Sequence, residues 1–567
     1  MKDKKVKLST KIIVGLIAIM TLSLFIIQYL LGITLNIGYA EGYFFVGLYV
    51  TTIGVILFTS KIIDMEKTVL DNKKNLKDNI RSANSEVDFK KLILPLVLVA
   101  GPFVISILGN IVTSPLFNSK MYSEQIGEIE EVKFEDFFEK LDLTKVPVVD
   151  KQLAIKLADK KLGERENLGS QVYVGEPVIQ LHKGKLVWVA PLHHSGFFKW
   201  LSNMEGTPGY IVVSATNQRD VTYIDSHKIK YQPGSYFNFD ITRKVRYSKE
   251  GYLEGLVDYS FELNEEGVPF WVISTYKNEK FLGLEEATGI ITLNATTGEI
   301  AKYRLDQIPS WVDRAQPEYF ITNQLQNRGK YIRGVFNFSN KDKFMISELG
   351  NIIYNKNSCS LFTGLTSIGA DESITSFVSV DMKTKKVYKF NVSGATEYAA
   401  SMSAEGKVQN LKYVASSPIL VNIDGIPTYF MTLKDKEGLI KQYAFVSVKD
   451  YTTVATNENV DIAVKEYKKA VSQNSVGKEE IQTAADTTLT LPVVRIGSEK
   501  IENDLVYKFI LDTKNIEKYK NKTIIFIAKS SISDELALTK EGDTLEIKFS
   551  EIDSDVIYVT SVENKTI

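Results

Sequence analysis

The chain has 567 residues, a formal net charge of −1, 44% hydrophobic residues and 24% charged residues. This length exceeds that of one ordinary domain, so two or more globular units are expected. A net charge near zero gives no reason to expect the clustered basic surface that nucleic acid requires, and no nucleic-acid partner is expected. Cys359 is the only cysteine, which excludes an intramolecular disulfide, and it is predicted to be a small buried apolar residue. The frequent Lys, Asn and Ile residues are typical of a low-GC Gram-positive bacterium.

Three long apolar segments near the N-terminus predict transmembrane helices. They are Ile12–Ile33, Tyr43–Ile63 and Leu92–Val112, and each has about the 20 residues that a helix needs to cross a bilayer. The first is too long for the core of a signal peptide and has no small-residue cleavage site, so it is expected to be retained. Apart from Lys61, the spans carry no charged residue, which argues against an ion-coupled transporter.

The basic residues that flank these segments predict their orientation. Lysines cluster before the first span and again in the loop of residues 64–91, whereas the loop of residues 34–42 has no Lys or Arg. Because basic residues favour the cytoplasmic side, the N-terminus and the loop 64–91 are predicted to be cytoplasmic. Everything from about Ser114 is predicted to be extracytoplasmic. The chain is therefore expected to be a multi-pass protein of the cell membrane, with the lipid bilayer as one partner.

An acidic juxtamembrane segment, residues 116–148, follows the third span. Phe134, Phe137, Phe138 and Leu141 recur in it at helical spacing, among many acidic residues. This pattern predicts an amphipathic helix with a solvated acidic face. A Ca²⁺ site is the alternative for the acidic run, but the run lacks the Asp-x-Asp-x-Asp-Gly spacing of a calcium loop.

A helix that follows Asp150 opens an α+β domain predicted for residues 149–305. Asp150 can cap this helix, an apolar stripe follows one side of it, and Gly163 ends it. Short strands come next, and a strand–turn–strand unit recurs along the chain at residues 210–221, 289–300, 377–387 and 444–454. Each copy has a β-branched run, a short polar turn and a return strand, which predicts β-hairpins of one kind.

The helix of residues 151–162, the strands after it and the hairpin Leu293-Asn-Ala-Thr-Thr-Gly-Glu-Ile300 resemble the PepSY domain of exported bacterial proteins. The last hairpin of that family commonly has an Asp-Ala-x-Thr-Gly-Glu-Val character, and Asn294 stands here where the family often has an acid. The resemblance covers residues 150–225 and 255–303. It implies a PepSY-like fold for them and a non-catalytic regulatory or inhibitory role, and it carries over no functional residue.

The fold class expected for the whole chain is a helical membrane N-terminus followed by strand-rich α+β domains and a small β-barrel. Residues 306–471 are predicted to form a second α+β domain, with helices at 396–405 and 460–471. Residues 472–488 are polar and poor in large apolar residues, as is typical of a linker. Residues 489–567 contain five strand-like runs and a Gly-Asp turn, which suit an OB- or SH3-like barrel.

The segment from His182 to Trp200 contains the candidate site residues. His193, His194 and Ser195 are adjacent, which suggests a nucleophile or a metal site. Neighbouring strand residues point to opposite faces, however, so the two histidines are not expected to share one ion. No HExxH, Cys pair or Gly-x-Ser-x-Gly accompanies them, and no metal or cofactor is expected.

The aromatic residues of the same segment suggest a binding surface as an alternative to a catalytic site. Phe197, Phe198 and Trp200 either pack at a sheet edge or, if exposed, form a binding surface. The sequence thus favours a membrane-anchored, non-enzymatic extracytoplasmic protein that binds another envelope component, protein or polymer. A hydrolase or peptidase acting on envelope substrates through residues 182–200 is one alternative. A subunit of a larger membrane assembly is another.

Overall fold

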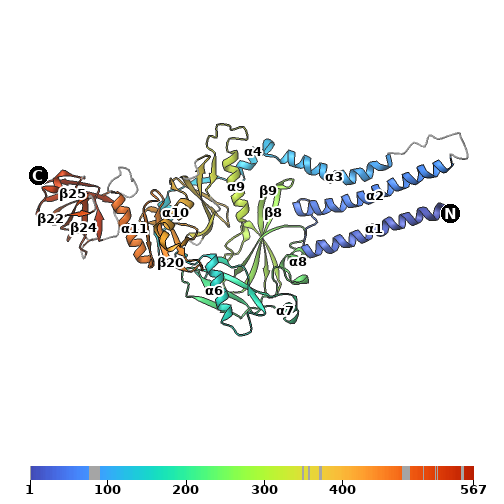
Figure 1. Cartoon of the computed structure of the whole chain (residues 1–567), viewed down its shortest axis with the longest axis horizontal. Helices are drawn as coiled ribbons and strands as arrows, with labels where there is room; N and C mark the ends of the chain where they lie inside the picture. The colour runs from blue at the N-terminus through green and yellow to red at the C-terminus, as the bar shows by residue number, and fades with distance from the viewer. Residues whose placement is uncertain are drawn as a thin grey trace.

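In the computed structural model, three long helices project from a strand-rich body (Figure 1). The structure describes residues 2–75, 90–347, 350–355, 358–369, 373–475, 486–501, 504–516, 519, 522–530, 532–550 and 555–567. The helices are α1 (Lys2–Leu31), α2 (Ala40–Asn75) and α3 (Lys90–Thr113). Their segments Lys11–Leu31, Ala40–Ile63 and Lys90–Thr113 are long and apolar enough to cross a membrane. The prediction of three apolar membrane helices is confirmed. The loop predicted at residues 64–91 begins as a continuation of α2, and its residues 76–89 lie outside the described part.

The body begins with a five-stranded sheet covered by α6 (Lys151–Gly163). Asp150 caps this helix as predicted, because its carboxylate accepts a hydrogen bond of 3.0 Å from the Leu153 amide. The apolar stripe of α6 is buried against the sheet. The strands are ordered β2-β4-β5-β6, with β3 also paired to β4. The elements in chain order are β2 (Val172–Val174), β3 (Val178–His182), β4 (Lys185–His194), α7 (Phe197–Ser202), β5 (Tyr210–Ser214) and β6 (Val221–Ile224).

The second sheet has four antiparallel strands in the order β10-β9-β8-β7. It shares one apolar core with the first sheet, in which Val189 and Tyr210 of the first pack with Phe261 and Trp271 of the second. Two short helices precede it and one follows. The elements are η1 (Phe237–Phe239), α8 (Ile241–Arg246), β7 (Gly255–Leu263), β8 (Pro269–Lys280), β9 (Gly283–Asn294), β10 (Ile300–Arg304) and η2 (Leu305–Gln307).

The third sheet has seven strands in the path β1-β15-β14-β13-β11, with β12 and β16 paired beside it. Ile321 and Leu325 of α9 (Glu318–Tyr331) are buried against this sheet. Its strands are β1 (Ile129–Glu131), β11 (Phe344–Ile346), β12 (Asn351–Asn355), β13 (Ser358–Ser367), β14 (Ser373–Asp381), β15 (Val387–Phe390) and β16 (Gly394–Ala395).

The fourth sheet shares a core with the third, in which Phe362 and Phe377 pack with Tyr429 and Ala444. Helices form where the sequence predicts them at residues 396–405 and 460–471, although both are longer than predicted. The elements are α10 (Glu397–Lys407), η3 (Gln409–Leu411), β17 (Val414–Ala415), β18 (Ile419–Ile423), β19 (Ile426–Lys434), β20 (Ile440–Ser447), β21 (Val454–Asn457) and α11 (Val460–Ser475).

The C-terminal sheet has six strands in the order β26-β24-β23-β22-β25-β27 and an apolar core of its own. The long strand β22 pairs with β25 through its first half and with β23 through its second half. Residues 476–485, which belong to the predicted linker, lie outside the described residues. The elements are β22 (Asp486–Ile501), β23 (Asp504–Leu511), β24 (Ile525–Lys529), η5 (Asp534–Ala537), β25 (Thr544–Ser550), β26 (Val556–Tyr558) and β27 (Ser561–Asn564).

All four recurring strand–turn–strand segments are antiparallel hairpins, as predicted. Each belongs to a different sheet: β5 with β6, β9 with β10, β14 with β15 and β20 with β21. Strands β6, β10 and β21 are edge strands, whereas β1 lies outside β15. Seven or eight positions separate the innermost paired residues quoted for each hairpin. Those pairs are Val213 with Val221, Leu293 with Ile300, Val380 with Val387, and Val446 with Val454.

The acidic juxtamembrane segment is not the amphipathic helix that its spacing predicts. It forms α4 (Pro115–Glu124), the strand β1 and the single turn α5 (Phe134–Phe137). Strand β1 pairs in parallel with β15, and Phe134 and Phe138 are buried in the core shared by the third and fourth sheets. The helical spacing of these aromatic residues therefore reflects their burial in this core. Strand β1 obtains backbone hydrogen bonds from the sheet, so the segment does not need to be one continuous helix.

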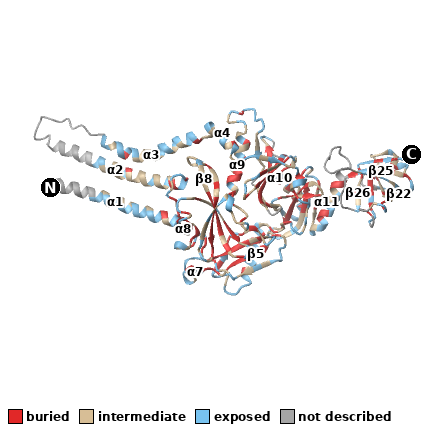
Figure 2. Cartoon of the chain, turned by 180° about the vertical axis from the view of Figure 1, so that it is seen from behind, coloured by how far each residue is buried: buried red, intermediate tan, exposed pale blue. Residues whose placement is uncertain are grey.

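The body rests directly on one end of the membrane helices. The loop between α1 and α2 bonds to the second sheet and to the turn before it. Asn36 donates to the Leu253 carbonyl of that turn (2.9 Å), and Asn278 of β8 donates to the Gly38 carbonyl (2.7 Å). Figure 2 shows that buried residues concentrate in the sheets, whereas the helices beyond this junction are mostly exposed or half-buried. The loop 32–39 and the body therefore lie at the same end of the three helices.

Candidate functional site

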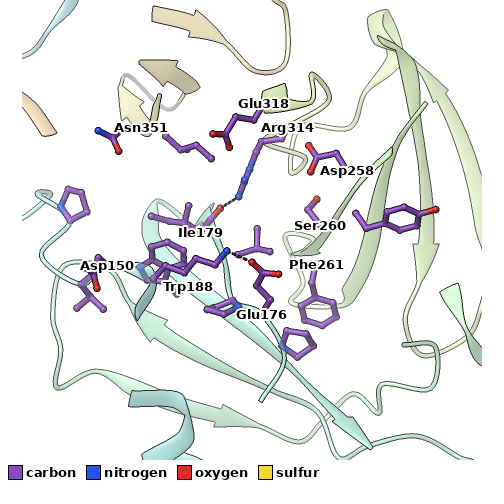
Figure 3. Close-up of a pocket in the computed structure, with 18 of the residues that line it drawn as sticks. Asp150, Glu176, Ile179, Trp188, Asp258, Ser260, Phe261, Arg314, Glu318 and Asn351 are labelled. Atoms are coloured by element: carbon purple, nitrogen blue, oxygen red, sulfur yellow. Dashed lines mark hydrogen bonds and ion pairs between the residues drawn. The ribbon is translucent and has the colours of Figure 1, made fainter. Parts of the chain in front are cut away.

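A cavity of about 790 Å³ lies where the first four sheets meet (Figure 3). Strands β3 and β4 form one wall and β7 and β8 form a second. Strands β12, β18 and β19 also line it, together with the starts of α6, α8 and α9 and the connecting residue Arg314. Its apolar surface includes the rings of Trp188, Phe261 and Trp271. Its volume falls in the range of small-molecule sites, which are concave, largely apolar and equipped with a few polar groups.

One guanidinium is the central polar group of this cavity. Arg314 donates from Nη2 to the Ile179 carbonyl at 2.9 Å, and Figure 3 shows it between Ile179 and Glu318. Its buried Nε has no hydrogen-bond partner among the described residues. A buried donor without a partner is costly, so this arginine retains capacity to bond a ligand acceptor.

Two carboxyl groups face the same space as this arginine. Asp258 has a φ of +53° and sits at an irregularity between Val257 and Tyr259 that pushes it out of the β7 ladder. Asp258 is exposed to the open cavity, but the surrounding protein desolvates its carboxyl and so raises its pKa, and the Arg314 charge partly offsets that effect. Burial likewise raises the pKa of Glu318, the first residue of α9, again against the charge of Arg314. Both groups are available as acceptors for ligand donors.

Two further acidic residues of the cavity are held by lysines. Glu176 forms an ion pair with Lys151, and Asp150 forms one with Lys434 of the fourth sheet. Asp150 also caps α6, so its position is fixed by the helix start. These pairs neutralise their charges and leave Asp258, Glu318 and Arg314 as the groups best placed to bind a polar ligand.

A buried ionisable cluster lies behind the cavity wall. Glu262 is fully buried and accepts hydrogen bonds from the Ser260 hydroxyl (2.7 Å) and from the Asp313 amide (3.2 Å). Burial raises its pKa to about 7, and the charge of Asp313 adds to the effect. The Asp313 carboxylate accepts from the Leu181 amide (2.8 Å) and from the Tyr354 hydroxyl (3.0 Å). The hydrogen bonds of this cluster connect β3, β7 and β12. Because Glu262 holds a proton in the folded chain, the stability of this junction depends on pH.

His193 lines the cavity, but its environment is that of a packed aromatic residue. It is only 7% exposed, and its ring lies 5.5 Å from Tyr173 and 6.2 Å from Trp271, stacked on the latter. Burial lowers its pKa to about 4, so the ring is neutral at pH 7. His194 is half-buried and Ser195 is exposed, and neither lines the cavity. The alternation along β4 therefore separates the two histidines as the sequence predicts.

His182 is not close to the other histidines of its segment. It pairs with Lys185 at the turn end of the β3–β4 hairpin, while His193 lies at the opposite end of β4. Eight residues separate Lys185 from His193, which in a strand corresponds to about 26 Å. Among the described residues, no group of three or more His, Cys, Asp or Glu side chains is placed to hold a metal ion.

The three predicted binding aromatics divide between core and surface. Trp200 is 2% exposed and packs against Tyr236 and Phe239, with ring centroids 5.2 and 5.5 Å away. Phe198 is 80% exposed and Phe197 is 38% exposed. Trp200 therefore supports the segment from inside, and only the two phenylalanines are accessible to a partner.

Sequence reasoning missed Arg314, Asp258 and Glu318. They come from a connecting segment, a strand irregularity and a helix start, so no spacing rule links them. The one local signal is the charged pair Asp313–Arg314 between the apolar residues Val312 and Ala315. A buried charged pair in an apolar context points to a functional or structural junction.

No family model and no curated protein matches this sequence. Solved structures with some likeness include a mutant of Synechocystis apocarotenoid oxygenase, at 8% identity and a TM-score of 0.14 over 50% of this chain and 48% of that one. Trypanosoma rangeli sialidase is similar at 8% identity and a TM-score of 0.16, over 68% of this chain and 54% of the sialidase. A putative glycoside hydrolase from Parabacteroides distasonis is similar at 8% identity and a TM-score of 0.17, over 68% of this chain and 95% of the hydrolase. The chain spans about half the length of the oxygenase, and TM-scores this low carry no argument about fold or function.

Proposed function

We propose that this chain is a membrane-anchored, non-enzymatic binding or regulatory protein on the extracytoplasmic side of a bacterial cell membrane. Its partner is an envelope component, protein or polymer, that places a small polar group in the cavity around Arg314. The observation that carries this proposal is the cavity itself, because residues from four sheets converge on one space with aromatic walls and unpaired polar capacity.

The charges of the cavity specify the chemistry of the group it would take. Asp258 and Glu318 accept hydrogen bonds, so they suit hydroxyl or amino donors. Arg314 suits one acceptor, such as a carbonyl or carboxylate oxygen. The rings of Trp188 and Trp271 cover the apolar part of the ligand. A small group with several donors and one acceptor therefore fits best.

Several features support the extracytoplasmic orientation and the regulatory role. Lysines cluster at the N-terminal end of α1, and basic residues recur in the last part of α2 and the segment after it, whereas the loop 34–42 has no Lys or Arg. This distribution favours a cytoplasmic N-terminus. The body shares its end of the helices with that loop, which has no Lys or Arg. We keep the PepSY-like character of residues 150–225 and 255–303 and the OB- or SH3-like character of the C-terminal unit as part of this proposal. The continuous strand β22, shared by both halves of its sheet, supports the latter.

The hydrolase alternative has less support, because His182 lies far from His193 and Ser195 does not line the cavity. A general base must reach its proton within hydrogen-bonding distance or through one water. The alternative of a subunit in a larger membrane assembly rests on the exposed sides of the three helices. Lipid would cover these sides equally well, so they do not favour a protein partner.

Photo-crosslinking in whole cells tests the proposal. A photoreactive amino acid replaces Ser417, an exposed residue at the cavity, and the control position is Leu538 on the C-terminal unit. We expect a discrete adduct from position 417 only. Asp258→Asn in the same chain should weaken it about 10- to 100-fold, since a hydrogen bond to a charged group contributes about 1.5–3 kcal/mol. An adduct that is equal at both positions, or unchanged by Asp258→Asn in a folded chain, would contradict the proposal.

A further inference from the structure

A hydrogen-bonded junction fixes one face of the body at the end of the first membrane helix. In α8, Arg243 donates from Nη1 to the Leu30 carbonyl (2.8 Å), and Arg246 donates from Nε to the Gly32 carbonyl (2.9 Å). The Tyr247 hydroxyl donates to the side-chain oxygen of Gln28 at 2.7 Å. Residues 28–32 are the last turn of the apolar span Lys11–Leu31 and the glycine after it. This face of the body therefore lies at the end of a segment that is long and apolar enough to cross a membrane.

An exposed apolar patch continues from that junction. It consists of Phe197, Phe198 and Leu201 of α7, Met204 just after it, and Phe237 of η1, and we call it the α7 patch. Phe198 is 80% exposed, Phe237 is 61% exposed and Leu201 is 50% exposed. Large exposed apolar side chains gathered in one place are unusual in a soluble surface and indicate a partner.

Arg243 connects the patch to the membrane helix. The same guanidinium that bonds the Leu30 carbonyl also donates from Nε to the Phe237 carbonyl at 2.6 Å. The patch is therefore separated from the end of α1 by a single side chain. Figure 1 shows α7 and α8 together at the end of the body that faces the three helices.

The buried core beneath the patch holds its side chains outward. Trp200 lies 5.7 Å from Phe197 and 5.9 Å from Phe237, measured between ring centroids, so it joins α7 to η1. With Trp200 filling the interior, Phe198 and Leu201 remain on the outside. The exposed side chains of Lys199 and Lys249 flank this region and can reach anionic headgroups.

We propose that the α7 patch inserts into the headgroup region of the outer leaflet and holds the body at a fixed tilt against the membrane. Aromatic side chains favour the membrane–water interface, and a short apolar surface flanked by lysines suits interfacial binding. A lipid surface is the occupant because the patch is continuous with the junction at α1, whose outer end must itself lie at that interface. This inference uses none of the cavity residues and is independent of the cavity ligand.

Site-selective labelling of the full-length chain tests this inference. Cys359 is buried, so a single cysteine introduced as Phe198→Cys can be labelled with an environment-sensitive NBD fluorophore. Leu538→Cys is the matched control, because Leu538 is 68% exposed and belongs to the C-terminal unit. Both proteins are reconstituted in vesicles of phosphatidylethanolamine and phosphatidylglycerol, with and without a lipid that carries a nitroxide near the headgroup.

The expected result is a blue-shifted NBD emission at position 198 and at least threefold quenching by the nitroxide lipid, with neither effect at position 538. A label at Phe237→Cys should behave like the one at 198. Unshifted, unquenched emission at both patch positions in a folded chain would overturn the inference. So would a blue shift that appears only after envelope extract is added, because it would assign the patch to a protein partner.

Discussion

Replacing Glu262 with glutamine should remove the contribution of this carboxyl to the pH dependence of stability. The folded chain holds a proton on this fully buried carboxyl up to a pKa of about 7, whereas the ordinary value is 4.5. A raised pKa of an acid stabilises the fold below pH 4.5, and that stabilisation is lost as pH rises through 7. At 1.36 kcal/mol per pKa unit, the difference corresponds to about 3 kcal/mol.

The Glu262→Gln substitution leaves the packing and most of the hydrogen bonding in place. The glutamine carbonyl can accept from the Asp313 amide, as the Glu262 carboxyl does. The Ser260 hydroxyl, which now donates to Glu262, can instead accept from the glutamine amide, because a hydroxyl both donates and accepts. The substitution should therefore change how the free energy of unfolding varies with pH more than it changes the free energy of unfolding at low pH.

Urea unfolding of the full chain in lipid nanodiscs, followed by tryptophan fluorescence between pH 4.5 and 8, measures this effect. Trp271 lies in the adjacent strand β8 and reports on the junction. We expect the free energy of unfolding of Glu262→Gln to fall by about 3 kcal/mol less than that of the parent over this range. Glu541→Gln, at an exposed residue, is the control and should keep the parent slope. Equal slopes in the parent and in Glu262→Gln would refute the reasoning.

Three further predictions concern burial, the contact with the membrane helices and the orientation. Trp200→Ala should destabilise the body by about 3–5 kcal/mol because it empties a buried aromatic site, whereas Phe198→Ala should change the unfolding midpoint little, as thermal unfolding would show. Arg246→Gln should loosen the body from the membrane helices, because the 2% exposed guanidinium bonds the Gly32 carbonyl; increased protease cleavage after α1 would report this, and unchanged cleavage would contradict it. A cysteine at Asn75 should resist an impermeant thiol reagent on wall-stripped cells while one at Leu538 reacts, and the reverse pattern would overturn the orientation.

Local patterns in the sequence were sufficient for the membrane helices, the hairpins and the cap of α6. A run of about 20 apolar residues has few structural outcomes, because a helix satisfies its own backbone groups without a partner. Each hairpin likewise depends on a turn of a few residues between two β-branched runs. The buried state of Cys359 follows from residue type alone, and the structure confirms it.

The juxtamembrane segment and the cavity depended on contacts between residues far apart in the chain. The spacing of Phe134 and Phe138 fits a helix, but β1 pairs with β15, more than 250 residues later, and that pairing extends the backbone before them. The same long-range packing buries Trp200 while it leaves Phe198 exposed, although both belong to one short helix. Arg314 and Glu318 are only four residues apart, but Asp258 of β7 reaches them through the tertiary packing of the body. The burial of apolar surface between whole sheets drives these tertiary contacts. The free energy of that burial depends on residues far apart in the chain, so no local pattern in the sequence reveals it.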